Sequence, residues 1–137
     1  MIAVDTNVLV RFYCDDPADP QARRQRPVAR RVMTESPALF VALTVVLELE
    51  WVLRGFYGLE PARVCSVLEH LLGMAHVTVE RWETVKDAAD LHRAGLNFAD
   101  ALHTVASRAC DSFVSFDAPL ARASTRLKLA PPIFVPS

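Results

Sequence analysis

The sequence lacks the markers of several protein classes. Its three cysteines, Cys14, Cys65 and Cys110, are an odd number with no close pair among them, which disfavours a disulfide framework or a cysteine-based zinc site and fits a reducing compartment. No basic leader precedes an apolar core, because Asp5 interrupts the first apolar run, so we expect no signal peptide. The most apolar window, 38–53, is too short to span a bilayer and contains two glutamates. We therefore expect a cytoplasmic protein without a membrane segment.

Several easily recognised chemical motifs are also missing. The chain has no glycine-rich phosphate loop and no nucleophile elbow. Its formal net charge of −1 lacks the basic excess that is typical of nucleic-acid-binding domains. The four histidines do not have the spacing of zinc ligands; they are His70, His76, His92 and His103.

The composition is that of an ordinary globular domain. With 137 residues, 52% of them hydrophobic and 23% charged, the chain is long enough to bury a core and too apolar for disorder. It contains no internal repeat, no low-complexity tract and no obvious linker. We therefore predict a single domain over residues 1–137.

Hydrophobic periodicity predicts strands that alternate with helices. The expected strands cover 1–4, 38–42, 76–79, 112–116 and 133–135. The expected helices cover 8–13, 20–34 with a kink or break at Pro27, 44–57 before Gly58, 60–72, 82–94 before Gly95, 98–109 after Asn97 as cap, and 119–125. Because hairpin turn pairs are absent, this order predicts an α/β fold, with a mostly parallel sheet of four to five strands between layers of helices.

Two aspartates come directly after predicted strands. Asp5 ends the first apolar run, and Asp117 ends the strand over 112–116. In open α/β sheets, ligands bind at the carboxyl edge of the strands, so both carboxylates are candidates for one site. The alternative is structural, because aspartate is a favoured N-cap and both residues precede a predicted helix.

Glu48 is a third candidate acid. On a helix its neighbours one turn away are apolar or uncharged, and no cation is among them. Glu50 differs, because Arg54 lies four residues on and can pair with it. A carboxylate on a core-facing stripe is costly unless something such as a metal compensates its charge. The alternative is a helix rotation that lets Glu48 reach water.

Asp100 is a fourth candidate, with a strong structural alternative. Asn97 and Asp100 resemble a capping box, and an acid in a first helical turn suits the helix macrodipole. Together, however, four acids at one edge of the sheet would form an oxygen-rich pocket. Such a pocket suits Mg²⁺ or Mn²⁺ rather than Zn²⁺.

These segments resemble a PIN domain, and specifically the VapC toxin ribonucleases of bacterial toxin–antitoxin pairs. The resemblance covers nearly the whole chain. It is carried by residues 1–11 (MIAVDTNVLVR), 45–53 (VVLELEWVL), 97–102 (NFADAL) and 115–117 (SFD). It implies a PIN-like three-layer α/β/α sandwich with a divalent-metal site.

The resemblance assigns roles to single residues. The acids of the family match Asp5, Glu48, Asp100 and Asp117, which would be the catalytic and metal-binding residues. Auxiliary positions beside the site match Thr6, Asn7 and Ser115. Two positions depart from the family pattern: Asn97 stands where many relatives carry an aspartate, and Ser115 replaces a more frequent threonine but keeps the hydroxyl. Neither change predicts an inactive site.

The resemblance also implies the chemistry and the partners. It predicts an Mg²⁺- or Mn²⁺-dependent endoribonuclease that cleaves structured RNA of the tRNA or ribosomal class and inhibits translation when free of its VapB-type antitoxin. A homodimer is expected. For the helix over 60–72, most apolar positions are expected in the core.

Two arginine-rich segments are candidates for RNA contacts, because phosphates are bound mainly by arginine and lysine. The candidate residues are Arg23, Arg24, Arg122 and Arg126, within clusters that also contain Arg26, Arg30, Arg31 and Lys128. The alternative for both clusters is a solvated helix face.

Other readings of the acids are weaker. A haloacid-dehalogenase-like phosphatase needs an acid two residues after Asp5, where this chain has Asn7. A receiver-type signalling domain needs a lysine after the last strands, and none is well placed. The main alternative is a non-catalytic PIN-like module that binds a protein, and the presence of all four acids weighs against it.

Overall fold

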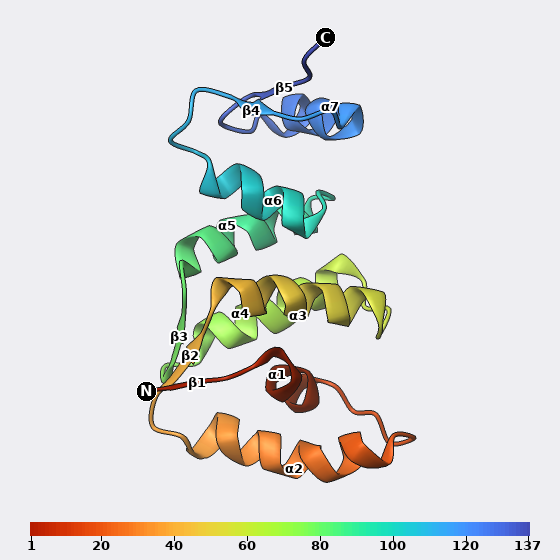
Figure 1. The fold of residues 1–137 in the computed structure, drawn as a ribbon, viewed down its shortest axis with the longest axis vertical. Coiled ribbons are helices and arrows are strands. Elements are labelled where there is room, and N and C mark those ends of the chain that lie inside the picture. Colours follow the sequence, from red (N-terminus) through yellow and green to blue (C-terminus); the bar gives the residue numbers. More distant parts are fainter. The chain divides into compact units, whose positions relative to one another are not determined.

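The computed structural model describes residues 1–137 and contains five strands and seven helices in alternation (Figure 1). The strands are β1 (Ile2–Ala3), β2 (Leu39–Val41), β3 (Val77–Val79), β4 (Phe113–Val114) and β5 (Ile133–Phe134). The helices are α1 (Thr6–Tyr13), α2 (Pro20–Glu35), α3 (Leu43–Gly55), α4 (Pro61–Gly73), α5 (Trp82–Arg93), α6 (Phe98–Ala106) and α7 (Ala118–Leu127). Every predicted element is present, and the α/β class is confirmed.

The chain forms two compact units, Met1–Trp82 and Glu83–Ser137. The first unit contains a three-stranded sheet in the order β1-β2-β3, and the second contains the pair β4-β5. All strand pairs are parallel, as predicted, but the five strands divide between two sheets. The assignment of residues 1–137 to one domain stays a prediction.

In the first unit, apolar strands and helix faces build the core. Leu39 of β2 lies opposite Ile2 of β1 and Val77 of β3. Helix α1 packs against α2 and α3, and α4 packs against α3 and β3 (Figure 1). The completely buried side chains come from all of these layers and include Leu9, Met33, Leu39, Val41, Val46, Leu49, Leu53, Val64 and Leu68. The core position predicted for most apolar residues of the helix over 60–72 is thereby confirmed.

Helix α2 runs without a break through Pro27, so of the kink or break that was expected there the break is absent, and the kink stays a prediction. A proline inside a helix removes one backbone hydrogen bond, here the bond to the carbonyl of Arg23, and its ring crowds the preceding turn. Pro27 is exposed, while the buried residues of the helix are Ala22, Ala29 and Met33. The packing of this small-residue face thus does not depend on the lost bond.

The predicted helix ends agree with the backbone geometry. Gly58 and Gly95 have φ values of +66° and +110°, conformations that favour glycine because it has no Cβ. Helix α3 itself ends at Gly55, and the N–H of Leu59 then donates to the carbonyl of Leu53 at 3.0 Å. Glycine thus turns the chain where the apolar pattern stops.

The second unit has a smaller core. Its main buried residue is Phe98 of α6, which has no exposed surface and contacts the ring of His92 edge-on at 5.7 Å between centroids. Helices α5, α6 and α7 add Val85, Ala88, Ala101, Leu102 and Leu120. No helix in either unit has the length and apolar character needed to cross a membrane.

Candidate active site

Asp5 links the end of β1 to the start of α1. The ladder with β2 continues through Val4, whose N–H donates to the carbonyl of Phe40 at 3.1 Å. Asp5 then caps α1, because its Oδ1 accepts the N–H of Thr6 at 2.8 Å. The capping role is therefore confirmed. It occupies one carboxylate oxygen and leaves Oδ2 without a hydrogen bond from the protein.

The orientation of α3 differs from the prediction for Glu48. The buried residues of the helix are Val46, Leu49, Glu50 and Leu53, so the core-facing stripe passes through Glu50. Glu48 follows Val46 by two residues, about 200° around the helix, and is exposed. The expectation that Glu48 faces the core was wrong, and the alternative that it reaches water was correct.

Glu50 is the buried acid of α3. It is 1% exposed, and its Oε2 accepts a hydrogen bond from Arg54 Nε at 2.8 Å, as the spacing of four residues predicted. The guanidinium compensates the buried charge, so this carboxylate serves the fold.

Asp5 and Glu48 line the same cavity of about 300 Å³ in the first unit. Thr6 and Asn7 line it too, so the predicted catalytic and auxiliary residues of this unit meet there, whereas the candidate RNA-binding residues Arg23 and Arg24 do not line it. The Thr6 hydroxyl is buried and has no hydrogen-bond partner in the protein. Most buried polar groups are satisfied, so an unpaired hydroxyl in the lining that also contains two carboxylates is a polar group able to bind a ligand or a water.

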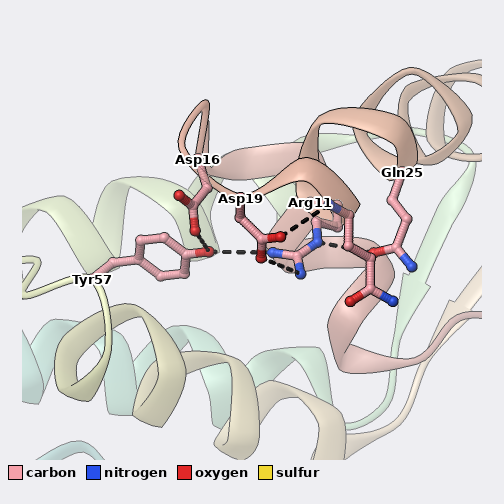
Figure 2. A network of polar contacts seen from close by, with 6 residues as sticks. Arg11, Asp16, Asp19, Gln25 and Tyr57 are labelled. Atoms are coloured by element: carbon pink, nitrogen blue, oxygen red, sulfur yellow. Dashed lines mark hydrogen bonds and ion pairs between the residues drawn. The ribbon is translucent and has the colours of Figure 1, made fainter.

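A polar network that was not predicted contributes four residues to the lining of this cavity, Arg11, Asp16, Asp19 and Tyr57 (Figure 2). Arg11 of α1 donates from Nε to Gln25 Oε1 at 3.0 Å and from Nη1 to the Tyr57 hydroxyl at 3.3 Å. The Tyr57 hydroxyl donates to Asp16 Oδ2 at 3.4 Å, and Arg11 Nη2 lies 3.8 Å from Asp19 Oδ2. The network places one guanidinium among the carboxylates of the cavity.

Only part of this network could have been found in the sequence. Arg11 follows Asn7 by four residues, so on a helix both share one face. Asp16 and Asp19 lie between the predicted helices over 8–13 and 20–34, and no local pattern marks them as site residues. Tyr57 lies two residues after the end of α3, and no local pattern links it to α1.

In the second unit, Asp117 has the same relation to a strand and a helix as Asp5. It follows β4 and caps α7, because its Oδ1 accepts the N–H of Leu120 at 3.0 Å. Its own N–H donates to the Ser115 hydroxyl at 3.0 Å. Ser115 thus holds the backbone of Asp117, and its auxiliary role at a site stays a prediction.

Asp100 lies in the first turn of α6. Asn97 caps this helix, and its side-chain oxygen accepts the N–H of Asp100 at 3.2 Å. Burial raises the pKa of Asp100, the negative charge of Asp117 raises it further, and His103 lowers it. The second unit therefore brings Asp100 and Asp117 close enough to repel each other.

The candidate RNA-binding arginines lie on exposed helix faces. Arg23 lines a cavity of about 460 Å³ with Arg26 and Arg30. Arg24 lines another of about 290 Å³ with Asn7 and Arg11. On α7 of the second unit, Arg122 and Arg126 are exposed one turn apart.

The candidate acids therefore occur as two pairs, one in each unit. Neither unit contains a group of three or more acids, histidines or cysteines arranged to hold a metal ion. Carboxylates with free oxygens and nearby hydroxyls are the donors that Mg²⁺ and Mn²⁺ prefer, so each pair fits such an ion chemically. The union of all four acids in one site stays a prediction.

A comparison with protein families matches residues 2–125 to the PIN domain. The match includes both acid pairs and confirms the PIN-like fold class. Comparisons with curated proteins and with solved structures found no similar protein. Since the family model covers most of the sequence, the chain belongs to the PIN domain family.

Proposed function

We propose that this protein is a metal-dependent endoribonuclease whose site combines Asp5, Glu48, Asp100 and Asp117. PIN domains are in general nucleases that use divalent metals, and the family match spans all four acids. The observation that carries the proposal is the cavity in the first unit. Asp5 with a free carboxylate oxygen, the exposed Glu48, and Thr6 with an unpaired hydroxyl all line this cavity.

The donor set fits Mg²⁺ or Mn²⁺, and we assign Asp5 and Asp100 as direct ligands. When bound, the cation supplies Lewis-acid activation of water and neutralises charge at the scissile phosphate. The carboxylates of Glu48 and Asp117 ligate directly or through water, or accept the proton of the attacking water as general bases. The capping bonds of Asp5 and Asp117 fix both carboxylates before substrate binds, which reduces the cost of ordering the site.

RNA phosphates are negatively charged, so an RNA substrate needs positively charged side chains near the acids. Arg11 already lies in the acidic cavity, where it offsets part of the negative charge. Arg23 and Arg24 of α2 have no ion pair in the structure and line cavities on either side of that helix. We propose that they contact phosphates along the RNA, as do Arg122 and Arg126 of α7.

The test is cleavage of a pool of structured RNA, including tRNA and ribosomal RNA, by the purified protein with Mg²⁺, Mn²⁺ or EDTA. Asp5→Asn keeps a good N-cap, and Asp100→Asn keeps the side-chain volume, so both variants are expected to fold. We expect cleavage only with metal, and a loss of about 100-fold or more in each variant.

Two exposed acids outside the site give matched controls. Glu35→Gln and Asp111→Asn remove one negative charge from the first and the second unit, and neither carboxylate has a hydrogen bond or ion pair in the structure. Both should cleave RNA like the wild type. Cleavage that survives EDTA, or that persists in Asp5→Asn and Asp100→Asn, would reject the four-acid site. An inactive, folded and metal-binding wild type would favour a protein-binding module.

We also propose that the protein is a VapC-type toxin of the cytoplasm, paired with a VapB-type antitoxin. Three free cysteines suit a reducing compartment. Induced expression in a bacterium should arrest growth for the wild type and not for Asp5→Asn. Growth arrest by both the wild type and Asp5→Asn would show that toxicity does not depend on the candidate acids.

A homodimer is the expected assembly. Trp51 of α3 and Phe56, the residue directly after this helix, are 61% and 72% exposed, and exposed aromatic residues are enriched in interfaces. Light scattering should give twice the mass of the chain for the wild type, and the mass of one chain for the double variant Trp51→Ser and Phe56→Ser. A wild-type monomer across the micromolar range would contradict the dimer.

A further inference from the structure

A second cavity of the first unit has no acid in its lining. It measures about 630 Å³ and is formed by the end of α1, the C-terminal half of α2, one face of α4 and the loop before α4. No aspartate or glutamate lines it. Its polar groups come from Arg30, Arg63, His70, Thr34 and Ser66.

Two guanidinium groups face this cavity without a counter-ion. Arg30 and Arg63 make no ion pair and donate no side-chain hydrogen bond in the structure, although other arginines of the unit are paired, as Arg26 is to Asp15 at 3.0 Å. They come from different helices, α2 and α4. Two unpaired positive charges in the lining of one cavity favour the binding of an anion there, and the fork of donors on arginine suits phosphate oxygens.

His70 adds a third donor, and its orientation is fixed. The Tyr13 hydroxyl and Nδ1 of His70 lie 2.8 Å apart, and the two rings meet edge-on. Burial raises the pKa of Tyr13, so this side chain stays a neutral hydroxyl. A hydroxyl that donates to Nδ1 leaves the proton of the neutral imidazole on Nε2, which can then donate to a ligand.

The rest of the lining is apolar and aromatic. Phe12, Tyr13, Leu59 and Val67 are half-buried and form walls of the cavity. The volume is within the range of small-molecule sites and is larger than an inorganic anion needs. A ligand that combines a phosphate with a flat ring would use both the cationic and the aromatic parts.

We propose that this cavity binds a nucleotide, with its phosphate between Arg30 and Arg63 and its base against the aromatic wall. The phosphate comes from a free mononucleotide or from an RNA strand. The second source would place a substrate contact near the C-terminal end of α1, away from Asp5 at its N-terminal end. The site uses none of the four acids, so it is independent of the nuclease proposal.

Calorimetry on the full chain in EDTA tests the proposal, with AMP, GMP, adenosine and a 5′-phosphorylated tetranucleotide as probes. We expect AMP or GMP to bind at least about tenfold more tightly than adenosine, because arginine–phosphate bonds are charge-assisted. Arg30→Gln and Arg63→Gln should each weaken nucleotide binding about tenfold. Tighter binding of the tetranucleotide than of AMP identifies RNA as the source, and the reverse identifies a free nucleotide.

The matched control is Arg31→Gln. Arg31 is the next residue of α2, carries the same charge, is exposed and lines none of the cavities described. It should change binding by less than about twofold, since a surface charge contributes little at moderate salt.

Three results would overturn the site. They are equal binding of AMP and adenosine, an equal loss in Arg31→Gln and Arg30→Gln, and competition by a glutamate-rich peptide as strong as that by the tetranucleotide. The last result would indicate an acidic protein as the partner. Asp5→Asn should bind nucleotides like the wild type, so failure of the nuclease proposal leaves this test unchanged.

Discussion

The unpaired hydroxyl of Thr6 leads to a prediction in which a conservative substitution stabilises the protein. Thr6 is 5% exposed, and its Oγ1 has no hydrogen-bond partner. Thr6→Val replaces this hydroxyl with a methyl group of similar size and keeps the β-branched shape at the first position of α1. We therefore expect the metal-free variant to be more stable than the wild type.

The magnitude follows from the cost of burying a polar group without a partner. That cost is about 1–3 kcal/mol, and the helix propensities of threonine and valine are similar, so a gain of about 1 kcal/mol is expected. For 137 residues the unfolding entropy near Tm is about 290 cal/mol/K, so this gain corresponds to a rise of about 3 °C in Tm.

Differential scanning calorimetry in EDTA measures this shift, and Thr104→Val provides the control. Thr104 is equally buried, at 1% exposed, but its hydroxyl donates to the carbonyl of Asp100 at 2.8 Å. Loss of a satisfied hydrogen bond should lower the free energy of unfolding by about 1 kcal/mol. The two substitutions are chemically identical, so their opposite signs isolate the effect of hydrogen-bond satisfaction.

A destabilisation of Thr6→Val as large as that of Thr104→Val would refute the reasoning. It would mean that the Thr6 hydroxyl has a partner in solution, such as a bound water. The interpretation of the cavity as a site with an unsatisfied donor would then be lost.

Three further predictions concern stability. Burial and then Asp117 raise the pKa of Asp100 above 3.8, so the stability that its neutral form contributes is present below pH 3.8 and is lost as pH rises through the folded-state pKa. Asp100→Asn should therefore stabilise the metal-free protein at pH 7 and not at pH 3 in urea unfolding; equal effects at both values would contradict this. Phe98→Ala should cost about 3–5 kcal/mol in the same assay, because Phe98 is completely buried, and a loss below about 1 kcal/mol would mean that the site collapses. Arg54→Met should cost about 1–3 kcal/mol, because the buried Glu50 carboxylate loses its bond at 2.8 Å; an unchanged midpoint would show that other contacts hold Glu50.

Local sequence patterns predicted most of the secondary structure. The expected helix over 60–72 and the observed α4 (Pro61–Gly73) differ by one residue at each end, because Pro61 and the apolar repeat specify that helix within its own sequence. Capping by Asn97 could be predicted for the same reason. Interactions between residues up to four positions apart produce patterns in the sequence, so the structures that they form can be predicted from it.

The orientation of α3 could not be predicted in this way. Apolar residues occur nearly all around this helix, so two rotations about its axis are compatible with the sequence pattern. The prediction used the rotation in which Glu48 points toward the core. Packing against the neighbouring elements selects the rotation in which Glu50 is buried and pairs with Arg54, whose side chain is 43% exposed. Tertiary packing decided between nearly equal alternatives.

The residues of the candidate site were predicted, but the contacts that they make with residues distant in the sequence were not. Asp5, Thr6, Asn7 and Glu48 were expected together and line one cavity. Tyr57, however, joins Arg11 and Asp16 across 46 and 41 residues, and no rule of local spacing connects them. The division of the strands into two sheets is likewise a pairing of distant segments.

The caps formed by Asp5 and Asp117 have a consequence for natural variation. Each carboxylate begins a helix, so selection for folding alone retains aspartate or asparagine at both positions, even in a descendant that has lost all chemistry. Glu48 and Asp100 make no side-chain hydrogen bond, so folding alone exerts little pressure to keep them. Among sequences of this family, it is therefore the loss of Glu48 or Asp100 that should mark an inactive descendant, while the two aspartates after the strands persist.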